Sequence, residues 1–264
     1  MEFFATTGSL PIHISDSKKG EKTIILLHGY LETLYIFEEF SEALQNEGFR
    51  VIAIDLPGHG LTGSNPEINS IEFAADITTE VLKISGVEKA YVAGHSMGGY
   101  VAQQCLARHP ETYEGIILLN SNPYADAPEK KADREREIEL INNGKLLSLA
   151  ALSIPKMYAA QNLRKFDDKI EETIEICEAH DPAGITACLR GMMQRTDNSE
   201  TLSKAEKALL FFGNDDKFIP TQMADQIASL CTKAVVRRLA PCGHNSFIEC
   251  QKECVAAITA FIKG

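Results

Sequence analysis

The stretch Ala90-Tyr-Val-Ala-Gly-His-Ser-Met-Gly-Gly-Tyr100 begins as a short apolar segment and ends in a helical pattern. Between them lies a serine with one glycine two residues before it and another two residues after it. The stretch predicts a strand over Ala90–Ala93, a helix over Met97–Arg108, and a sharp turn at Ser96 between them. The glycines on either side of the serine leave room for the helix to pack closely on the strand. Such a turn strains the serine backbone and exposes its hydroxyl above the carboxyl ends of the strands.

The same alternation of apolar runs and amphipathic stretches extends along most of the chain and indicates an α/β fold. The runs are mostly apolar throughout, as expected of parallel strands covered by helices on both faces. We therefore predict an eight-stranded, mostly parallel, doubly wound sheet. The predicted strands are Phe3–Ala5, Ile12–Ser15, Ile24–Leu27, Val51–Ile54, Ala90–Ala93, Gly115–Leu119, Ala208–Phe212 and Ala234–Leu239, the first two joined by a turn at Gly8-Ser9. The predicted helices among them are Leu34–Glu47, Ser70–Ser85, Met97–Arg108, Thr221–Leu230 and Gln251–Ile262.

One long segment departs from this alternation, because no strand pattern occurs between Asn122 and about Lys204. It contains amphipathic stretches near Leu146–Leu152, Asp168–Ala179 and Ala183–Met193. We predict an all-helical cap over residues 122–204, inserted into a core made of residues 1–121 and 205–264. The charged run Glu129–Glu139 is most simply the solvated face of a cap helix.

Composition excludes several classes of function. The 264 residues include 26 Lys and Arg against 37 Asp and Glu, a formal net charge of −11 that argues against binding nucleic acid or an anionic membrane surface. No signal peptide is evident, and no apolar stretch approaches the ~18 residues that a membrane helix needs. The seven cysteines form no Cys-x-x-Cys pair, so we expect reduced thiols in a cytoplasmic protein, with no metal and no cofactor. The oligomeric state stays open.

A serine hydroxyl is a weak nucleophile unless a base accepts its proton. His244 follows the strand Ala234–Leu239 and should lie at the sheet edge that carries Ser96, so it is the predicted base. His95 adjoins Ser96, but successive side chains point in different directions. The other histidines are expected to hold glycine-rich turns, for His28 and His59, or to lie at the surface, for His13, His109 and His180.

Two further groups complete this chemistry. A carboxylate must orient the histidine, and Gly213-Asn-Asp-Asp-Lys-Phe-Ile-Pro220 follows a strand at the same edge, where Asp215 or Asp216 could serve. Donors must also stabilise a developing oxyanion. The predicted donors are the backbone N–H groups of Met97, directly after the serine, and of Tyr30, in the loop after Ile24–Leu27.

Taken together, these segments resemble the α/β-hydrolase superfamily, and within it the small esterase, C–C hydrolase and haloperoxidase-like branch with a helical cap. The segments are His28-Gly29, Asp55-Leu-Pro-Gly-His-Gly60, Gly94-x-Ser96-x-Gly98-Gly99, Gly213-x-x-Asp216-x-x-x-Pro220 and Gly243-His244. They occur in the family order and cover nearly the whole core, whereas the cap matches only at Arg195-Thr-Asp197. The resemblance implies the α/β-hydrolase fold and selects Asp216 over Asp215 as the acid.

The expected function is a serine hydrolase that cleaves a small carboxylic ester or thioester through Ser96, His244, Asp216 and an acyl-enzyme. Two alternatives stay open: a lyase, C–C bond hydrolase or synthase using the same triad (of the menaquinone-pathway or hydroxynitrile-lyase type), and a non-catalytic ligand receptor. The cap should lie over Ser96, and the substrate pocket is expected to involve Leu31, Met157, Tyr158, Met192, Met193 and Phe218, although the cap residues among them are more simply explained as cap core.

Overall fold

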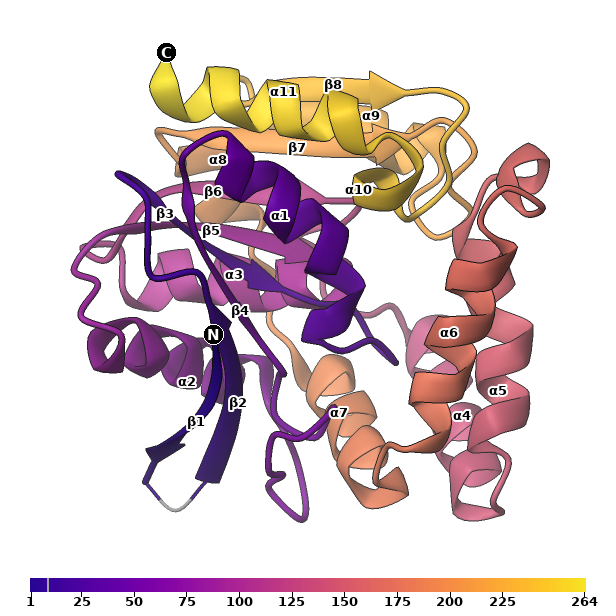
Figure 1. The fold of residues 1–264 in the computed structure, drawn as a ribbon. Coiled ribbons are helices and arrows are strands. Elements are labelled where there is room, and N and C mark those ends of the chain that lie inside the picture. Colours follow the sequence, from indigo (N-terminus) through magenta and orange to yellow (C-terminus); the bar gives the residue numbers. More distant parts are fainter. Residues whose placement is uncertain (9) are drawn as a thin grey trace.

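The computed structural model describes residues 1–8 and 10–264 of the chain (Figure 1). Its described strands form one eight-stranded sheet in the order β1-β2-β4-β3-β5-β6-β7-β8. Only the pairings β1–β2 and β2–β4 are antiparallel, so the predicted mostly parallel sheet is confirmed. The strands are β1 (Glu2–Thr7), β2 (Leu10–Asp16), β3 (Thr23–Leu27), β4 (Arg50–Ile54), β5 (Ala90–His95), β6 (Tyr113–Leu119), β7 (Ala208–Gly213) and β8 (Val235–Leu239). The predicted Gly8-Ser9 turn includes Ser9, which lies outside the described residues.

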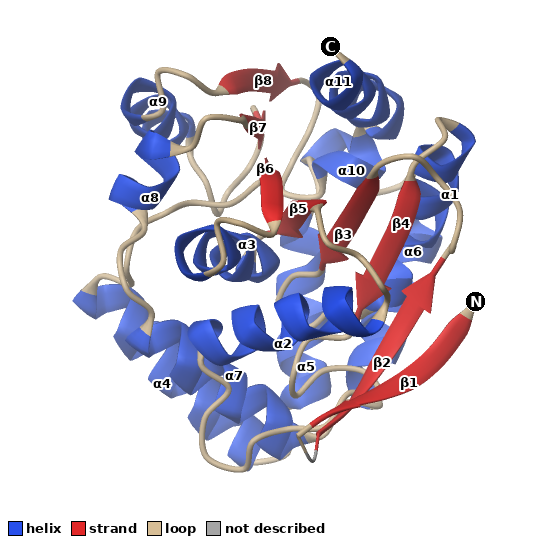
Figure 2. Cartoon of the chain, turned by 90° about the vertical axis from the view of Figure 1, so that its left-hand side faces the viewer, coloured by secondary structure: helices blue, strands red, loops and turns tan. Residues whose placement is uncertain are grey.

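Helices cover both faces of the sheet, as a doubly wound fold requires (Figure 2). One face is packed by α1 (Glu38–Asn46) and α11 (Gln251–Lys263), whose buried residues join Ile24 and Leu26 of β3 in one core. The other is packed by α2 (Ile71–Ile84), α3 (Met97–Arg108) and α9 (Thr221–Leu230), in a core with Ile25 and Leu27. Alternate residues of β3 thus point to opposite faces and are fully buried on both.

Between β6 and β7 the chain forms only helices in its described residues; most of them lie to one side of the core in Figure 1, whereas the last, Ser199–Lys204, packs on the core itself. They are α4 (Pro128–Asn142), α5 (Leu146–Ser153), η2 (Ile154–Met157), η3 (Ala160–Asn162), α6 (Asp167–Glu178), α7 (Pro182–Gln194) and α8 (Ser199–Lys204). The segments entering and leaving this insertion are hydrogen bonded to each other. Asn198 N–H donates to the Pro123 carbonyl over 2.8 Å, and Arg195 Nε donates to the Tyr124 carbonyl over 3.0 Å.

Helix α7 rests directly on the core. The Asn69 N–H donates to the Ala187 carbonyl over 3.1 Å, which ties α7 to the loop after β4. A methyl group at Gly191 would lie 1.8 Å from the Asn69 carbonyl oxygen, so this contact needs glycine. The close backbone approach fixes the insertion over the carboxyl end of the sheet.

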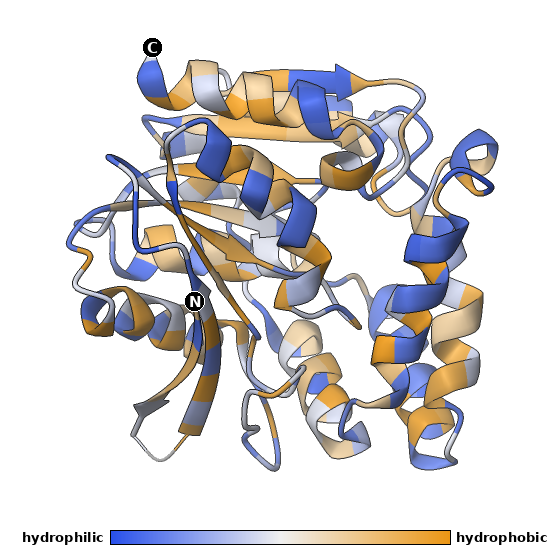
Figure 3. Cartoon of the chain, viewed as in Figure 1, coloured by the Kyte–Doolittle hydropathy of each residue, from blue (hydrophilic) through white to orange (hydrophobic). Residues whose placement is uncertain are grey.

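The hydropathy of the residues matches the position of their strands and helices in the fold (Figure 3). The central strands are apolar, whereas the edge strand β8 carries the exposed residues Arg237 and Arg238 before its buried last residue, Leu239. Charged side chains on an edge strand discourage pairing with another chain. None of the helices in the described residues has both the length and the apolar character needed to cross a membrane.

Two sequence-based expectations need correction. The predicted helix Leu34–Glu47 is divided into a 3₁₀ turn, η1 (Leu34–Phe37), and α1, and Asp55 accepts from the Leu34 N–H at the start of η1 over 2.8 Å. The surface positions predicted for His13 and His180 are wrong. His13 Nδ1 lies 2.8 Å from the buried Asp55 carboxylate, and His180 Nδ1 accepts a hydrogen bond from Gly60 N–H over 3.2 Å. His109 is half-exposed, and all seven cysteines are buried free thiols.

Candidate active site

Ser96 occupies the turn between β5 and α3 with φ 49° and ψ −112°. A positive φ at a residue other than glycine costs about 1–3 kcal/mol and persists only where the surroundings impose it. Packing imposes it here: a methyl group at Gly94 would lie 2.2 Å from the Gly98 carbonyl oxygen, and one at Gly98 would lie 2.0 Å from the Leu27 carbonyl oxygen. The strand and helix therefore meet more closely than any side chain allows, which leaves Ser96 half-buried at the sheet edge.

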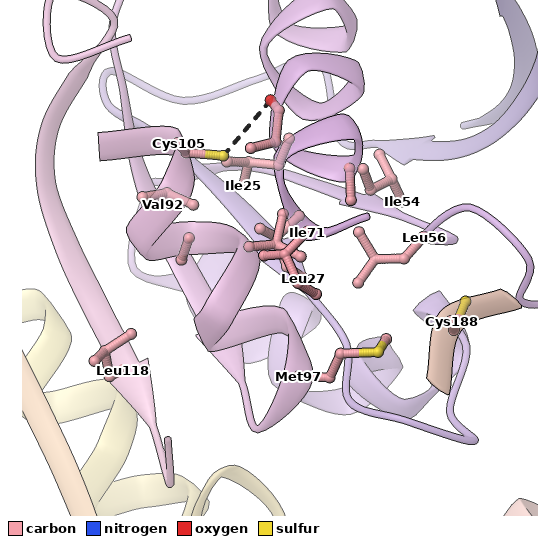
Figure 4. Close-up of a cluster of buried hydrophobic side chains, with 14 of the residues drawn as sticks. Ile25, Leu27, Ile54, Leu56, Ile71, Val92, Met97, Cys105, Leu118 and Cys188 are labelled. Carbon is pink, nitrogen blue, oxygen red and sulfur yellow. Dashed lines mark hydrogen bonds between the residues drawn. The ribbon is translucent and has the colours of Figure 1, made fainter. Parts of the chain in front are cut away.

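The start of α3 is anchored by its first side chain. Figure 4 shows Met97 in the buried cluster with Leu27 and Leu56, with Cys188 of α7 close by, and Met97 is 3% exposed. Further along α3, the Cys105 thiol donates to the Ala75 carbonyl of α2. As the first residue of the helix, Met97 has an N–H with no partner inside the helix. That N–H is thus available to a group bound beside Ser96.

His244 and Asp216 form a buried pair. His244 Nδ1 lies 2.8 Å from Asp216 Oδ2, and both side chains are almost inaccessible to solvent. Because a carboxylate only accepts, Nδ1 carries the hydrogen and Nε2 is left as an acceptor. Asp215, the alternative in sequence, is exposed. The Phe218 ring packs beside the imidazole at a centroid distance of 4.8 Å.

Four donors surround the Asp216 carboxylate. Besides His244, the N–H groups of Phe218 and Ile219 donate to Oδ1 over 2.7 and 3.0 Å, and Asn120 Nδ2 donates to Oδ2 over 3.0 Å. Burial acts to raise the pKa of Asp216, but the charge and hydrogen bond of His244, with the Asn120 amide, lower this pKa to about 2. The carboxylate therefore stays ionised beside the ring. Our sequence reasoning missed Asn120, although its position directly after β6, at the same edge, was an available signal.

The loop carrying His244 is attached to the helical insertion. The Met157 carbonyl accepts from the His244 and Asn245 N–H groups over 2.6 and 3.2 Å. Glu249, in α10 (Ser246–Glu249), accepts from Gly243 N–H over 2.7 Å with one oxygen. Its other oxygen accepts from Ala159 N–H over 2.9 Å and Asn162 Nδ2 over 2.7 Å. The position of the imidazole thus depends on contacts with η2 and η3.

His95 belongs to a second buried pair. Its Nδ1 lies 2.9 Å from Glu32 Oε2, and its Nε2 lies 3.1 Å from the His244 carbonyl oxygen. Glu32 Oε2 also accepts from Gly29 N–H over 2.6 Å. Burial acts to raise the pKa of Glu32, but His95 and this N–H hold it below its usual range. The pair therefore joins the loops that carry Tyr30, Ser96 and His244.

Two neutral histidines shape the loop that contains Tyr30. His28 Nε2 accepts from Leu56 N–H over 2.9 Å, and His59 Nε2 accepts from Leu31 N–H over 3.3 Å. Burial lowers the pKa of both rings, which keeps these nitrogens as acceptors. Leu31 is held at φ 65°. Among the described residues, the Tyr30 N–H has no hydrogen-bond acceptor, so it too can serve a bound group.

Ser96 and His244 line one cavity of about 460 Å³ between the core and the helical insertion. Over the described residues, no hydrogen bond joins the Ser96 hydroxyl to the His244 ring, a contact that often tightens only when substrate binds. Of the residues expected to form the pocket, Leu31, Met157, Met192 and Phe218 line this cavity. Tyr158 is instead buried beside Phe166, and Met193 lies outside the lining.

The cavity also has a charged wall that the sequence did not predict. Arg134 and Arg195 are 5% and 6% exposed, and both pair with Asp126, each over 2.6 Å. The Arg195 guanidinium also lies 3.9 Å from the centre of the Tyr100 ring. The reading of Glu129–Glu139 as a solvated face is therefore wrong for Arg134, which turns inward to reach Asp126. Nothing in a run of mostly charged residues distinguishes this arginine from its exposed neighbours.

Comparisons with known proteins agree with this architecture. The family described as "alpha/beta hydrolase fold" matches residues 22–250. The chain is 24% identical over 254 residues to a 2-hydroxy-6-oxononadienedioate/2-hydroxy-6-oxononatrienedioate hydrolase of Paraburkholderia phymatum, covering 89% of this chain and 85% of that one. It is 36% identical over 98 residues to a putative non-heme haloperoxidase of Mycobacterium phage D29, covering 37% and 35% of the two chains. The structure of a thermophilic esterase from Thermogutta terrifontis, with malate bound, superimposes with a TM-score of 0.92 at 24% identity, covering 100% of this chain and 98% of that one.

Proposed function

Because the chain belongs to the α/β hydrolase fold family, we propose that it is a serine hydrolase that cleaves a small carboxylic ester or thioester. The observation that carries this proposal is the 2.8 Å contact between His244 and Asp216, at the cavity that Ser96 also lines. A strained serine at a strand-to-helix turn and a histidine oriented by a buried carboxylate are the parts that acyl transfer needs.

In the proposed mechanism, His244 Nε2 accepts the Ser96 proton as the serine oxygen attacks the substrate carbonyl carbon. The resulting oxyanion accepts hydrogen bonds from the N–H groups of Tyr30 and Met97. His244 then gives its proton to the leaving oxygen or sulfur, which forms the acyl-enzyme. Water, deprotonated by His244, hydrolyses the acyl-enzyme, and Asp216 stabilises the imidazolium in both half-reactions. Residues 122–204 form the proposed cap that encloses the substrate.

A fluorophosphonate probe and a series of p-nitrophenyl esters of increasing chain length test this proposal. The wild-type protein should be labelled and should hydrolyse the shorter esters. The variant Ser96→Ala should lose both properties, and Asp216→Asn should lower kcat by about 10⁴-fold. Ser229→Ala, at an exposed serine of α9, is the matched control and should behave as wild type. Unlabelled wild-type protein, or ester turnover that survives in Ser96→Ala, would contradict the proposal.

Cleavage of a carbon–carbon bond by the same triad is the second candidate, favoured by the similarity to the hydrolase of Paraburkholderia phymatum. It predicts labelling of Ser96 without turnover of any ester in the series. Turnover of the ester series therefore separates the two candidates. Labelling of Ser96 does not, since both candidates require an activated serine.

A further inference from the structure

The charged wall of the cavity carries more positive than negative charge. Six charged side chains line the cavity: four cationic ones, Lys130, Arg134, Arg195 and Lys217, and two acidic ones, Asp126 and Glu137. The lining therefore has a formal charge of +2, in a chain whose net charge is −11. A concave, poorly solvated site of one sign attracts ligands of the opposite sign.

Arg134 and Arg195, the two buried arginines, do not each have a carboxylate of their own. They share the single carboxylate of Asp126, with Arg134 Nε 2.6 Å from Oδ2 and Arg195 Nη1 2.6 Å from Oδ1. Within the described residues, Arg134 Nη1 makes no hydrogen bond. A structural ion pair alone would need only one guanidinium for this carboxylate. The two buried guanidinium groups therefore exceed the charge of this carboxylate by one.

Two buried polar atoms without partners border the same wall. The Tyr30 hydroxyl and Glu137 Oε2 are almost fully buried and make no hydrogen bond among the described residues, and both side chains line the cavity. Burial raises the pKa of Tyr30 well above its usual value, so the hydroxyl stays a neutral donor. Burial also raises the pKa of Glu137. A buried donor left without an acceptor is costly, and a ligand oxygen would remove that cost.

We propose that Arg134, Arg195 and the Tyr30 hydroxyl bind a carboxylate carried by the substrate, so that the enzyme prefers esters or thioesters with a free carboxylate elsewhere in the molecule. Guanidinium groups match the planar carboxylate through two parallel hydrogen bonds. Ile154, Met157 and Met192 line the cavity as well and suit an aliphatic chain between the two ends of the substrate. Half-esters of aliphatic dicarboxylic acids have this chemistry. The inference rests on the proposed function and names its substrate class.

The test compares monomethyl half-esters, from glutarate to suberate, with neutral methyl esters of the same acyl length, measured by proton release. The wild-type protein should show the higher kcat/KM for at least one half-ester. In Arg134→Met the ratio of the two kcat/KM values should fall by about 10- to 100-fold, mainly through KM, because a charge-assisted hydrogen bond is lost. Arg136→Met is the matched control, since Arg136 lies on the same helix, is exposed and pairs with Asp133; it should leave the ratio unchanged.

Adipate binding, measured by calorimetry, tests the site without turnover. Wild-type protein should bind adipate at least tenfold more tightly than adipamide, its uncharged diamide, and Arg134→Met should lose this difference while Arg136→Met keeps it. Equal affinity for adipate and adipamide in the wild type overturns the inference, even if Arg134→Met does not fold. Hydrolysis of neutral esters with no preference for any half-ester overturns it too, and leaves the proposed function intact. Adipate binding through Arg134 with no ester turnover supports the site and contradicts the ester hydrolase.

Discussion

Asn120 illustrates how one residue positions another. It follows β6 with φ 52°, in the left-handed region that asparagine tolerates better than most residues. Its Nδ2 donates to Asp216 Oδ2 over 3.0 Å and to the Gly243 carbonyl over 3.1 Å. One amide therefore fixes both the carboxylate and the residue before His244. In the proposed triad, Asn120 is a positioning residue.

Replacing Asn120 by alanine should lower kcat for p-nitrophenyl esters by about tenfold and leave KM nearly unchanged, because the triad loses alignment rather than substrate contacts. The free energy of unfolding should fall by about 1–3 kcal/mol, measured by urea denaturation, since two buried hydrogen bonds are lost. Asn142→Ala, at an exposed position of α4, provides the comparison. A variant with wild-type kcat would show that Asn120 does not position the triad.

For single residues, the sequence predicted which residue types the site would contain better than it predicted which side chains contact each other. On local chemistry Asp215 and Asp216 were equivalent, and they separate only because the chain beyond them buries Asp216 against His244 and leaves Asp215 exposed. His13 failed as a surface prediction for the same reason, since its partner Asp55 is 42 residues away. Periodicity within a window carries no information about such distant contacts.

At the scale of elements, the short helix α10 links the core to the helical insertion. Glu249 at its end receives three hydrogen bonds, from Gly243, Ala159 and Asn162. All three partners are donors, so only an acceptor with two oxygens satisfies them. The carboxylate thus joins the loop that carries His244 to the segment around η3.

Glu249→Gln should destabilise the protein by about 1–3 kcal/mol, because the new amide group faces donors instead of accepting from them. The same change should lower kcat/KM for esters, since the loop of His244 loses one of its anchors. Thermal unfolding and steady-state kinetics measure the two effects. Glu253→Gln on α11 is a suitable control, because Glu253 is exposed. Unchanged kinetics in a destabilised Glu249→Gln protein would limit this link to a structural role.

Strands and long helices could be predicted from the sequence because each buries its own apolar pattern, as β5 and α2 do. Elements such as α8 and α10 could not, since four to six residues carry no periodic signal and tertiary contacts decide them. The inward turn of Arg134 also escaped prediction. It depends on Asp126, eight residues earlier, lying buried at the same wall of the cavity.

For the molecule as a whole, buried carboxylates determine how folding responds to acid. Asp16 is fully buried and accepts from Arg50 Nε and Nη2 over 3.0 and 2.7 Å. Burial acts to raise its pKa, but the hydrogen bonds from Arg50 and Lys18 lower it to about 2, from an ordinary value of 3.8. Because the folded-state pKa is the lower one, this stabilisation is present above about pH 4 and is lost as the pH falls towards 2. The pKa of Asp216 is lowered in the same way, so this carboxylate also stabilises the fold above about pH 4 and less so in acid.

Asp16→Asn should therefore be less stable than wild type by about 2 kcal/mol at pH 7, and the difference should shrink as the pH falls from 4 towards 2. Urea denaturation at pH 7, 4 and 3 measures it. The variant should keep part of the acid sensitivity, because Asp216 is unchanged. A stability difference that stays constant from pH 7 to pH 3 would refute this assignment.

The paired backbone segments at Pro123 and Asn198 give the helical insertion a single narrow stem, while β6 and β7 remain neighbours beneath it. The helices between Pro123 and Asn198 can therefore be exchanged as one unit, in evolution or by engineering, without a change in the order of the strands. Replacing these helices would discard Arg134 and Arg195 together with Met157, whose carbonyl accepts from the His244 N–H. Transplants across this family should accordingly succeed best when the graft also brings a carbonyl able to receive the His244 N–H.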